Sequence, residues 1–443
     1  MSHIFHRNPA QVLPVAARGE GCYLIDANGK RYFDGSGGAA VSCLGHGHPA
    51  VVAALKDQLD KLDYAHTSFF TSEPAEHLAN LMARLSPPSL GNVYFLSGGS
   101  EAVETALKMA RQFHVENGES QRTHFVSRRQ SYHGNTLGAL AIGGNLARRT
   151  LYEPLLVPST QVSACYPYRQ RLAGESDDAY VERLVAELEV TLLRLGPKTV
   201  AAFVAETVVG ATAGALEPLP GYLARVREVC DRYGVLLILD EVMCGIGRTG
   251  HYHAFEREGV VPDLLTLAKG LGGGYQPIGA VMASDRVVQT ITGGSGSFHH
   301  GHTYIGHPLA CAAALAVQRE IVEHNLCAQV RQRGEYLRGC LEERFAQHKH
   351  VGDIRGRGLF QAIELVQDRR NARPFPAEAR LHARIKHEAL TRGLLCYPSG
   401  GTADGVNGDH VLLAPPYISS EAQLKSAVEI LGDAVDASIA ALD

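Results

Sequence analysis

The sequence lacks several features that would place it outside the ordinary globular class. Its nine cysteines are scattered without a C-x-x-C pair, a pattern typical of small buried residues in a reducing compartment. No apolar run is long enough to span a bilayer, and residues 1–14 contain no apolar stretch of the signal-peptide type. No long basic run occurs and the net charge is only -4, so nothing points to nucleic acid or a membrane surface. These absences predict a soluble cytoplasmic protein.

The middle of the chain alternates strand-length apolar runs with amphipathic helical stretches. Strands are expected at residues 92–96, 123–127, 200–205, 235–239, 264–267 and 278–283, and helices at about 100–113, 185–195 and 222–233. The run Val235–Leu239 is apolar at every position, which is typical of a strand buried on both faces in a mostly parallel sheet covered by helices. This pattern predicts one large α/β domain.

The two ends of the chain have a different pattern. A hairpin is expected at residues 20–34, and the C-terminal part should contain a long helix from about residue 321, a strand around 359–365, a helix at 377–391 and a strand at 411–414. Ser420 and Gln423 form a capping box that begins the last helix. We predict an N-terminal segment (1–60) that joins a small domain, a large domain (61–320) and a C-terminal small domain (321–443).

Two motifs follow predicted strands and contain small or aromatic residues. The first, 97–102 (SGGSEA), lies between a strand and a helix, where backbone N–H groups and the helix dipole favour an anion. A plain turn with a serine cap is the alternative. The second is Tyr132-His133-Gly134, whose tyrosine could stack on a planar ligand or simply pack against the protein.

Two charged residues also follow predicted strands. Asp240 comes at the end of a buried strand, at the sheet edge where open α/β sheets bind ligands, although it could instead cap the following turn. Lys269 lies between an apolar strand and the glycine-rich loop 270–274. Burial there would lower its pKa and leave a nucleophilic amine, whereas an exposed loop lysine would have no special chemistry.

Two further patterns are weak signs of binding sites. Residues 245–250 have the form G-x-G-x-x-G, but residues intervene after the strand and no obvious helix follows, so a dinucleotide site is not expected. Four histidines, His299, His300, His302 and His307, fit no helical H-x-x-x-H spacing, and no metal site is predicted.

A lysine, an acidic partner for a ring nitrogen, a stacking aromatic and a phosphate cradle are what pyridoxal 5'-phosphate requires. Their order resembles the class III aminotransferases of fold type I, in particular those of the omega- or amine-transaminase type. The resemblance covers nearly the whole chain and includes the segments 34–37, 44–49, 301–308, 356–359 and 414–416. It implies an α/β fold with a large cofactor-binding domain, whose mostly parallel sheet is covered by helices, and a smaller α/β domain formed by both chain ends.

The resemblance also assigns roles to individual residues. Lys269 would carry the cofactor as a Schiff base, and Asp240 would keep the ring nitrogen protonated. The other cofactor-binding candidates are Tyr132 and Val242 on the two ring faces, His133 beside Tyr132, Gly99 and Ser100 at the phosphate, Glu206 near the ring, and Thr303. Thr303 would reach the phosphate in the neighbouring subunit, which implies a homodimer with shared active sites.

The resemblance further implies transamination between an amine or omega-amino acid and a keto acid, by a ping-pong mechanism. Leu412 stands where many relatives have a carboxylate-binding arginine, Ala40 is small, and Phe69 and Phe70 are expected near the cofactor mouth. Burying a carboxylate without a charged partner costs several kcal/mol, which favours pyruvate over 2-oxoglutarate as acceptor. Racemisation or decarboxylation with the same cofactor, and a non-catalytic cofactor-binding regulator, are the alternatives.

Overall fold

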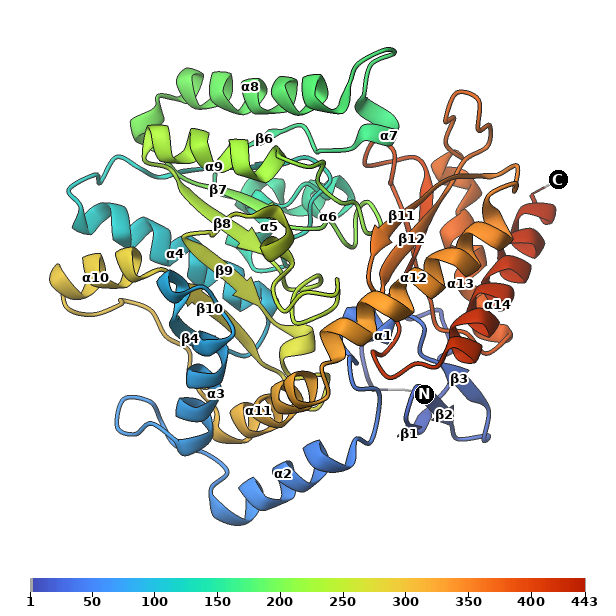
Figure 1. The fold of residues 1–443 in the computed structure, drawn as a ribbon, viewed down its shortest axis with the longest axis horizontal. Coiled ribbons are helices and arrows are strands. Elements are labelled where there is room, and N and C mark those ends of the chain that lie inside the picture. Colours follow the sequence, from blue (N-terminus) through green and yellow to red (C-terminus); the bar gives the residue numbers. More distant parts are fainter. Residues whose placement is uncertain (1–2, 443) are drawn as a thin grey trace.

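The computed structural model describes residues 3–442 and has a seven-stranded sheet at its centre (Figure 1). In spatial order the strands are β4 (Asn92–Leu96), β10 (Gly279–Ala283), β9 (Leu264–Leu267), β8 (Leu236–Asp240), β7 (Val200–Glu206), β5 (His124–Arg128) and β6 (Ser159–Val162). Strand β10 runs antiparallel to both neighbours, whereas the pairings from β9 to β6 are parallel. The predicted α/β fold with a mostly parallel sheet is confirmed.

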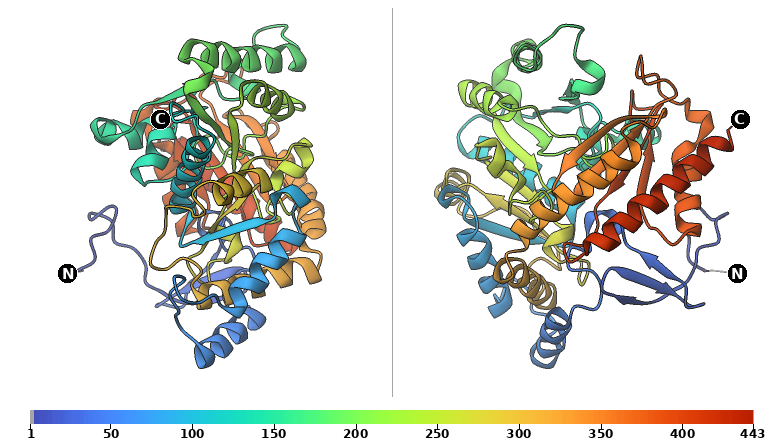
Figure 2. Two further views of the ribbon diagram at one scale, coloured as in Figure 1. Left: turned by 90° about the vertical axis from the view of Figure 1, so that its left-hand side faces the viewer. Right: turned by 45° about the vertical axis from the view of Figure 1, so that its right-hand side comes forward.

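Helices cover both faces of this sheet (Figures 1 and 2). Helices α4 (Gly99–Glu116) and α10 (Asp285–Gly293) lie over one face, and α8 (Asp177–Leu195) and α9 (Tyr222–Tyr233) over the other. Alternate residues of β8 enter the two resulting cores, because successive side chains of a strand point to opposite faces. Burial on both faces is the physical reason why this strand is apolar until Asp240.

A four-stranded antiparallel sheet forms the second layer of structure, in the order β11 (Val351–Arg357), β12 (Phe360–Leu365), β14 (Asp409–Leu413) and β13 (Tyr397–Gly400). It packs with α12 (Leu326–Phe345) and α13 (Leu381–Thr391), and α14 (Glu421–Ala440) packs against these two helices. A three-stranded sheet of β1 (Ala16–Glu20), β2 (Tyr23–Asp26) and β3 (Arg31–Phe33) contains the expected hairpin. The predicted domain boundaries at residues 60 and 320 stay a prediction.

Backbone hydrogen bonds connect the beginning of the chain to its end. The Phe33 N–H donates to the Gly393 carbonyl at 2.8 Å, and the Ala414 N–H donates to the Gly35 carbonyl at 2.8 Å. Figure 1 shows the resulting proximity of the blue N-terminal strands to the red C-terminal helices. Residues far apart in the sequence therefore share one side of the molecule.

The remaining helices are short or lie at the edge of the large sheet. Helices α2 (Pro49–Lys61) and α3 (Glu73–Arg84) pack against α11 (Pro308–Glu323). Four short helices connect larger elements: α1 (Gly37–Ala40), α5 (Leu137–Ile142), α6 (Leu146–Arg149) and α7 (Pro167–Gln170). Within residues 3–442 no helix is both long and apolar enough to cross a bilayer.

The C-terminal helices agree with the prediction only in part. Instead of one long helix from about residue 321, α11 ends at Glu323 and α12 begins at Leu326, because Asn325 adopts a φ of 48°. Asparagine is one of the few residues other than glycine that tolerates this left-handed conformation. The predicted capping box of α14 is confirmed, since Ser420 and Gln423 exchange backbone and side-chain hydrogen bonds.

A buried ionic cluster around Glu364 connects the two main sheets. Arg355 on β11 and Arg169 and Tyr166 on the segment after β6 all donate to the Glu364 carboxylate. Arg355 also donates through Nε to the Gly214 carbonyl at 2.8 Å, in the loop that follows β7. The Glu364 side chain is fully buried, so its negative charge has to be balanced by these donors.

We predict that Glu364→Gln destabilises the protein by about 3 kcal/mol, because the largely buried Arg169 loses its carboxylate and the buried Arg355 retains only Asp353. Urea unfolding followed by circular dichroism measures the change. The control is Glu388→Gln, which removes a partly exposed carboxylate of α13 paired with Arg392, the C-cap residue of that helix, and should cost less than about 1 kcal/mol. Equal effects of the two substitutions would contradict this role of the cluster.

Candidate functional site

A cavity of about 590 Å³ lies beyond the carboxyl ends of the central parallel strands. Strands β7 and β8 end at its wall with Glu206 and Asp240, and Lys269 comes two residues after β9. The structure brings together every candidate cofactor residue except Thr303, namely Gly99, Ser100, Tyr132, His133, Glu206, Asp240, Val242 and Lys269. Sites in open α/β sheets form at this edge because the connections diverge there.

Asp240 is held in one orientation by two hydrogen bonds. Its Oδ1 accepts from the Val242 N–H at 3.0 Å, and its Oδ2 lies 2.8 Å from His133 Nδ1. His133 Nε2 is buried and has no hydrogen-bond partner among the described residues. The wall of the cavity thus presents a fixed carboxylate together with an unsatisfied imidazole nitrogen, an arrangement typical of a site that a ligand completes.

Glu206 lies directly opposite Asp240 in the parallel pairing of β7 and β8. Its two carboxylate oxygens accept from the Tyr132 N–H at 3.0 Å and the Gly210 N–H at 2.9 Å. Burial raises the pKa of the Glu206 carboxyl, while His133 and the two backbone hydrogen bonds oppose that rise. Through its bond to the Tyr132 backbone, Glu206 positions the aromatic ring at the cavity.

Lys269 has an unusual backbone conformation and an unusual side-chain pKa. Its φ of 47° is left-handed, a strained conformation that in a residue other than glycine costs on the order of 1 kcal/mol and is concentrated at functional sites. Burial lowers the pKa of the Lys269 amine to about 8, although Asp240 and Glu206 favour its charged form. A substantial fraction of this amine is therefore neutral and nucleophilic slightly above neutral pH.

The beginning of α4 provides an anion-binding cradle. Its N-cap, Gly98, makes no side-chain hydrogen bond, so the first N–H groups of this long helix are left for a ligand. A Cβ on Gly99 would lie only 2.7 Å from Val242 Cγ1, so no larger residue fits beside Val242. Ser100 Oγ accepts from the Asn135 N–H at 3.0 Å, which leaves the hydroxyl proton to donate.

These features fit pyridoxal 5'-phosphate. A phosphate group suits the cradle at α4, an aldehyde suits the neutral amine of Lys269, and a pyridine nitrogen suits the Asp240 carboxylate. Tyr132 and Val242 supply an aromatic and an aliphatic wall for a flat ring.

Three residues that the sequence analysis expects near the cofactor do not line this chain's cavity. Phe69 and Phe70 are 79% and 68% exposed, and Thr303 is exposed at the end of the loop before α11. The Tyr64 hydroxyl donates to the Thr303 carbonyl at 3.0 Å. The segment between α2 and α3 lies at the surface of the single chain, so the expected place of the two phenylalanines near the cofactor mouth stays a prediction.

Other cavity residues are absent from the sequence prediction. Arg7, Arg148 and Tyr397 line the cavity, and the Arg148 guanidinium lies 4.9 Å from the centre of the Tyr132 ring. These residues come from the N-terminal segment, helix α6 and strand β13. No motif marks them, and only folding brings them to the ends of the central strands.

The remaining sequence patterns have structural roles. In the segment 245–250, buried Arg248 donates to the carbonyls of Leu359 and Pro415, and a 3-10 helix rather than an α-helix follows at Ala254–Glu258. Among the four clustered histidines, His300 Nε2 lies 2.8 Å from Thr105 Oγ1. Between residues 3 and 442 no group of three histidine, cysteine or acidic side chains is arranged to hold a metal ion.

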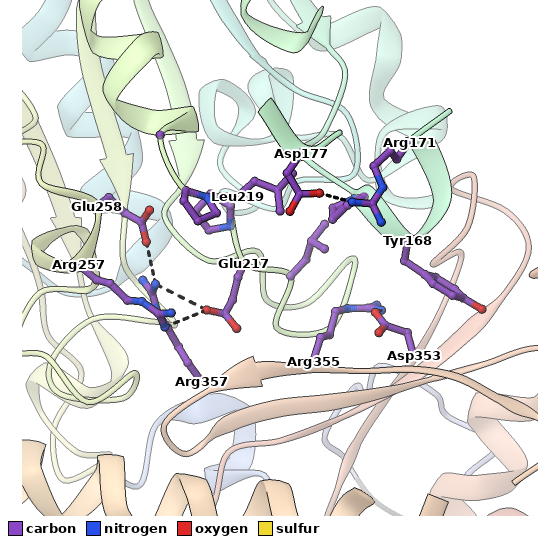
Figure 3. Close-up of a pocket in the computed structure, with 15 residues that line it drawn as sticks. Tyr168, Arg171, Asp177, Glu217, Leu219, Arg257, Glu258, Asp353, Arg355 and Arg357 are labelled. Atoms are coloured by element: carbon purple, nitrogen blue, oxygen red, sulfur yellow. Dashed lines mark hydrogen bonds and ion pairs between the residues drawn. The ribbon is translucent and has the colours of Figure 1, made fainter. Parts of the chain in front are cut away.

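A second cavity, of about 610 Å³, lies between the large sheet and β11 and is lined by four arginines. Figure 3 shows that each faces a carboxylate: Arg171 pairs with Asp177, Arg257 with Glu217, Arg355 with Asp353, and Arg357 with Glu258. Because its charges are mutually neutralised, this cavity has the character of a polar contact between sheets.

The family model described as aminotransferase class III matches residues 4–435. The chain belongs to the class III aminotransferases.

Individual relatives of this aminotransferase cover nearly its whole length. An uncharacterized aminotransferase of Schizosaccharomyces pombe is 45% identical over 100% of this chain and 96% of its own. The uncharacterized aminotransferase YodT of Bacillus subtilis is 41% identical over 98% of both chains. The omega transaminase of Pseudomonas jessenii, solved in complex with PMP, is 32% identical over 98% of this chain and 97% of its own, with a TM-score of 0.91. This similarity confirms the predicted family and its fold type I architecture.

We predict that in the apoprotein the rate of Lys269 acylation rises with pH around a midpoint of about 8, since only the neutral amine reacts. Pulse labelling with an acylating reagent between pH 6 and 10, read by peptide mass spectrometry, measures the midpoint. A free lysine peptide, with a pKa of about 10.4, is the reference. Asp240→Asn should move the midpoint lower, because Asp240 favours the charged amine. A midpoint equal to that of the peptide would contradict the burial argument.

Proposed function

We propose that this aminotransferase transfers an amino group from an amine or omega-amino acid to a keto acid, with pyruvate as the preferred acceptor, in two ping-pong half-reactions. The observation that carries the proposal is the placement of a half-buried lysine of lowered pKa beside the fixed carboxylate of Asp240. The family is established for transamination, so the finer proposal concerns the residues and the substrates. We also propose a cytoplasmic location, which the scattered cysteines support.

Pyridoxal 5'-phosphate would be held by residues of four segments. Lys269 would bond it as a Schiff base, the first turn of α4 with Gly99 and Ser100 would bind the phosphate, and Tyr132 and Val242 would enclose the ring. When bound, this cofactor supplies an electron sink for the charge that develops when a substrate carbon loses its proton. The PMP complex of the Pseudomonas jessenii relative supports this choice of cofactor.

The protein itself would supply the proton chemistry. In its neutral form the Lys269 amine would take a proton from the substrate carbon that bears the nitrogen. It would then deliver this proton to the carbon on the other side of that nitrogen. Asp240, oriented by Val242 and His133, would hold a proton at the ring nitrogen. Tyr132 would keep the ring in place, since Glu206 fixes its backbone.

A buried apolar cluster at one part of the cavity favours a small monocarboxylate acceptor. Leu412 is fully buried in this cluster with Ala40, Phe360 and Met243, and Met243 lines the cavity. A side-chain carboxylate of 2-oxoglutarate that faced this cluster would find no charged partner there. Racemisation and decarboxylation would use the same lysine and aspartate. Stoichiometric appearance of alanine from pyruvate separates transamination from both.

We further propose a homodimer in which Thr303 contributes to the neighbouring subunit's phosphate site. Thr303 is next to Tyr304, which is 60% exposed and contacts Tyr64. Phe69 and Phe70 are 79% and 68% exposed, and Phe70 lines a cavity together with Ile305. Large exposed apolar side chains gathered in one area are typical of a surface that another subunit covers.

With one good amine donor, we expect kcat/KM for pyruvate to exceed that for 2-oxoglutarate at least about tenfold. This is the smallest ratio expected from the free-energy cost of burying one carboxylate without a charged partner. Steady-state kinetics of the holoenzyme with both acceptors measure the ratio. Lys269→Ala serves as the control and should have no activity with either acceptor. A clear preference for 2-oxoglutarate would overturn the acceptor assignment and leave the lysine assignment standing.

A heterodimer of one Lys269→Ala subunit and one Thr303→Asp subunit should have about half of the wild-type activity, because one of its two sites is intact. Each homodimer should be nearly inactive, since aspartate repels the phosphate. The heterodimer is purified through two different affinity tags. A heterodimer as inactive as both homodimers, or a fully active monomer, would show that the sites are not shared.

A further inference from the structure

Arg148 is an arginine on the wall of the proposed active-site cavity whose charge has no partner in the described part of the chain. In the second cavity (Figure 3) each wall arginine faces a carboxylate. The Arg148 guanidinium, in contrast, forms no ion pair or hydrogen bond with any residue between 3 and 442, and it lies 4.9 Å from the centre of the Tyr132 ring. Its neighbour Arg149 donates instead to the carbonyls of Ala141 and Gly143 and holds the helix end in place.

The acidic groups of the same cavity are not free to pair with Arg148. Glu206 accepts from two backbone N–H groups, and Asp240 is engaged by Val242 and His133. A half-buried guanidinium without a carboxylate therefore stands on the wall of a site whose substrates are acids. Arginine suits the binding of an acidic substrate because its planar guanidinium binds both oxygens of a carboxylate, and partial burial strengthens these hydrogen bonds.

The position of Arg148 also indicates the length of the substrate. Arg148 lines a further cavity of about 470 Å³, formed with residues 144–147 and with the loop that contains Gly405. Arg148 thus lies on a wall shared by the active-site cavity and this further cavity. An extended donor chain can occupy this further space while its amino group stays in the cavity that Lys269 lines.

We propose that Arg148 binds the terminal carboxylate of the amino donor, so that the preferred donors are long-chain omega-amino acids. This inference rests on the proposed transamination. Arg7, the other arginine of the cavity, lies exposed on the N-terminal segment and competes for the same assignment. The structure favours Arg148 because it is half-buried and packs on Tyr132, whose backbone Glu206 fixes.

The test compares two donors of equal length, 6-aminohexanoate and hexylamine, with pyruvate as acceptor. In Arg148→Gln, kcat/KM for 6-aminohexanoate should fall about tenfold to a hundredfold, mainly through KM, as expected for the loss of a charge-assisted hydrogen bond. The value for hexylamine should change less than about twofold, which also shows that the variant is folded. Arg148→Lys should restore part of the loss, because it keeps the charge without the fork.

The matched control is Arg370→Gln, which removes an arginine that is 90% exposed and paired only with Asp368. It should leave both donors unaffected. Equal losses for both donors in Arg148→Gln, no loss for either, or a selective loss in Arg7→Gln instead would overturn the proposal.

A binding measurement distinguishes failure of this inference from failure of the proposed function. Calorimetric titration of the wild-type holoenzyme should show tighter binding of hexanoate than of hexanamide, and Arg148→Gln should abolish that difference. If neither donor is turned over but hexanoate binding depends on Arg148, the carboxylate site stands and the proposed donors are wrong. If hexanoate binds no more tightly than hexanamide, the carboxylate site is refuted.

Discussion

The parallel register of β7, β8 and β9 is the constraint on which the site depends. Because Glu206 lies opposite Asp240 and Asp240 lies opposite Thr266, the ends of three strands bring two carboxylates and the following Lys269 to one edge. A shift of the register by one residue would turn Asp240 to the other face of the sheet. The buried apolar residues of these strands, which pack against α4 on one face and α9 on the other, therefore determine where the chemistry can occur.

Burial and charge act in opposite directions at this edge. Desolvation lowers the pKa of Lys269 and raises that of Glu206, while the opposite charges of the site oppose both shifts. The backbone hydrogen bonds that Glu206 and Asp240 accept keep both carboxylates in place at the edge of a dry sheet. A lysine at this position is both reactive and held near an acid, and its left-handed backbone shows that the surrounding loop imposes the geometry.

Several elements were predictable because their signals are local. Strands β8 and β9 are apolar at nearly every position, Ser420 and Gln423 form a complete capping box, and Asp240 and Lys269 follow apolar runs. The break at Asn325 was missed because α11 and α12 continue a helical pattern on both sides of it. Strand β11 was missed because its glycines and charged residues give no alternation; Arg355 lies there to meet Glu364, a partner on another strand.

The sequence by itself determined the candidate chemistry: the order of a glycine-rich turn, an aromatic, an aspartate and a lysine, each placed after a strand, is encoded locally by apolar periodicity and glycine-rich turns. Tertiary structure alone decided what surrounds that chemistry. The hydrogen bond from Tyr132 to Glu206, the burial of Leu412 beside Ala40 and the contact of Arg148 with Tyr132 at the cavity wall join residues from separate segments of the chain. No local pattern records such contacts, because they arise only when separate elements pack around a common core.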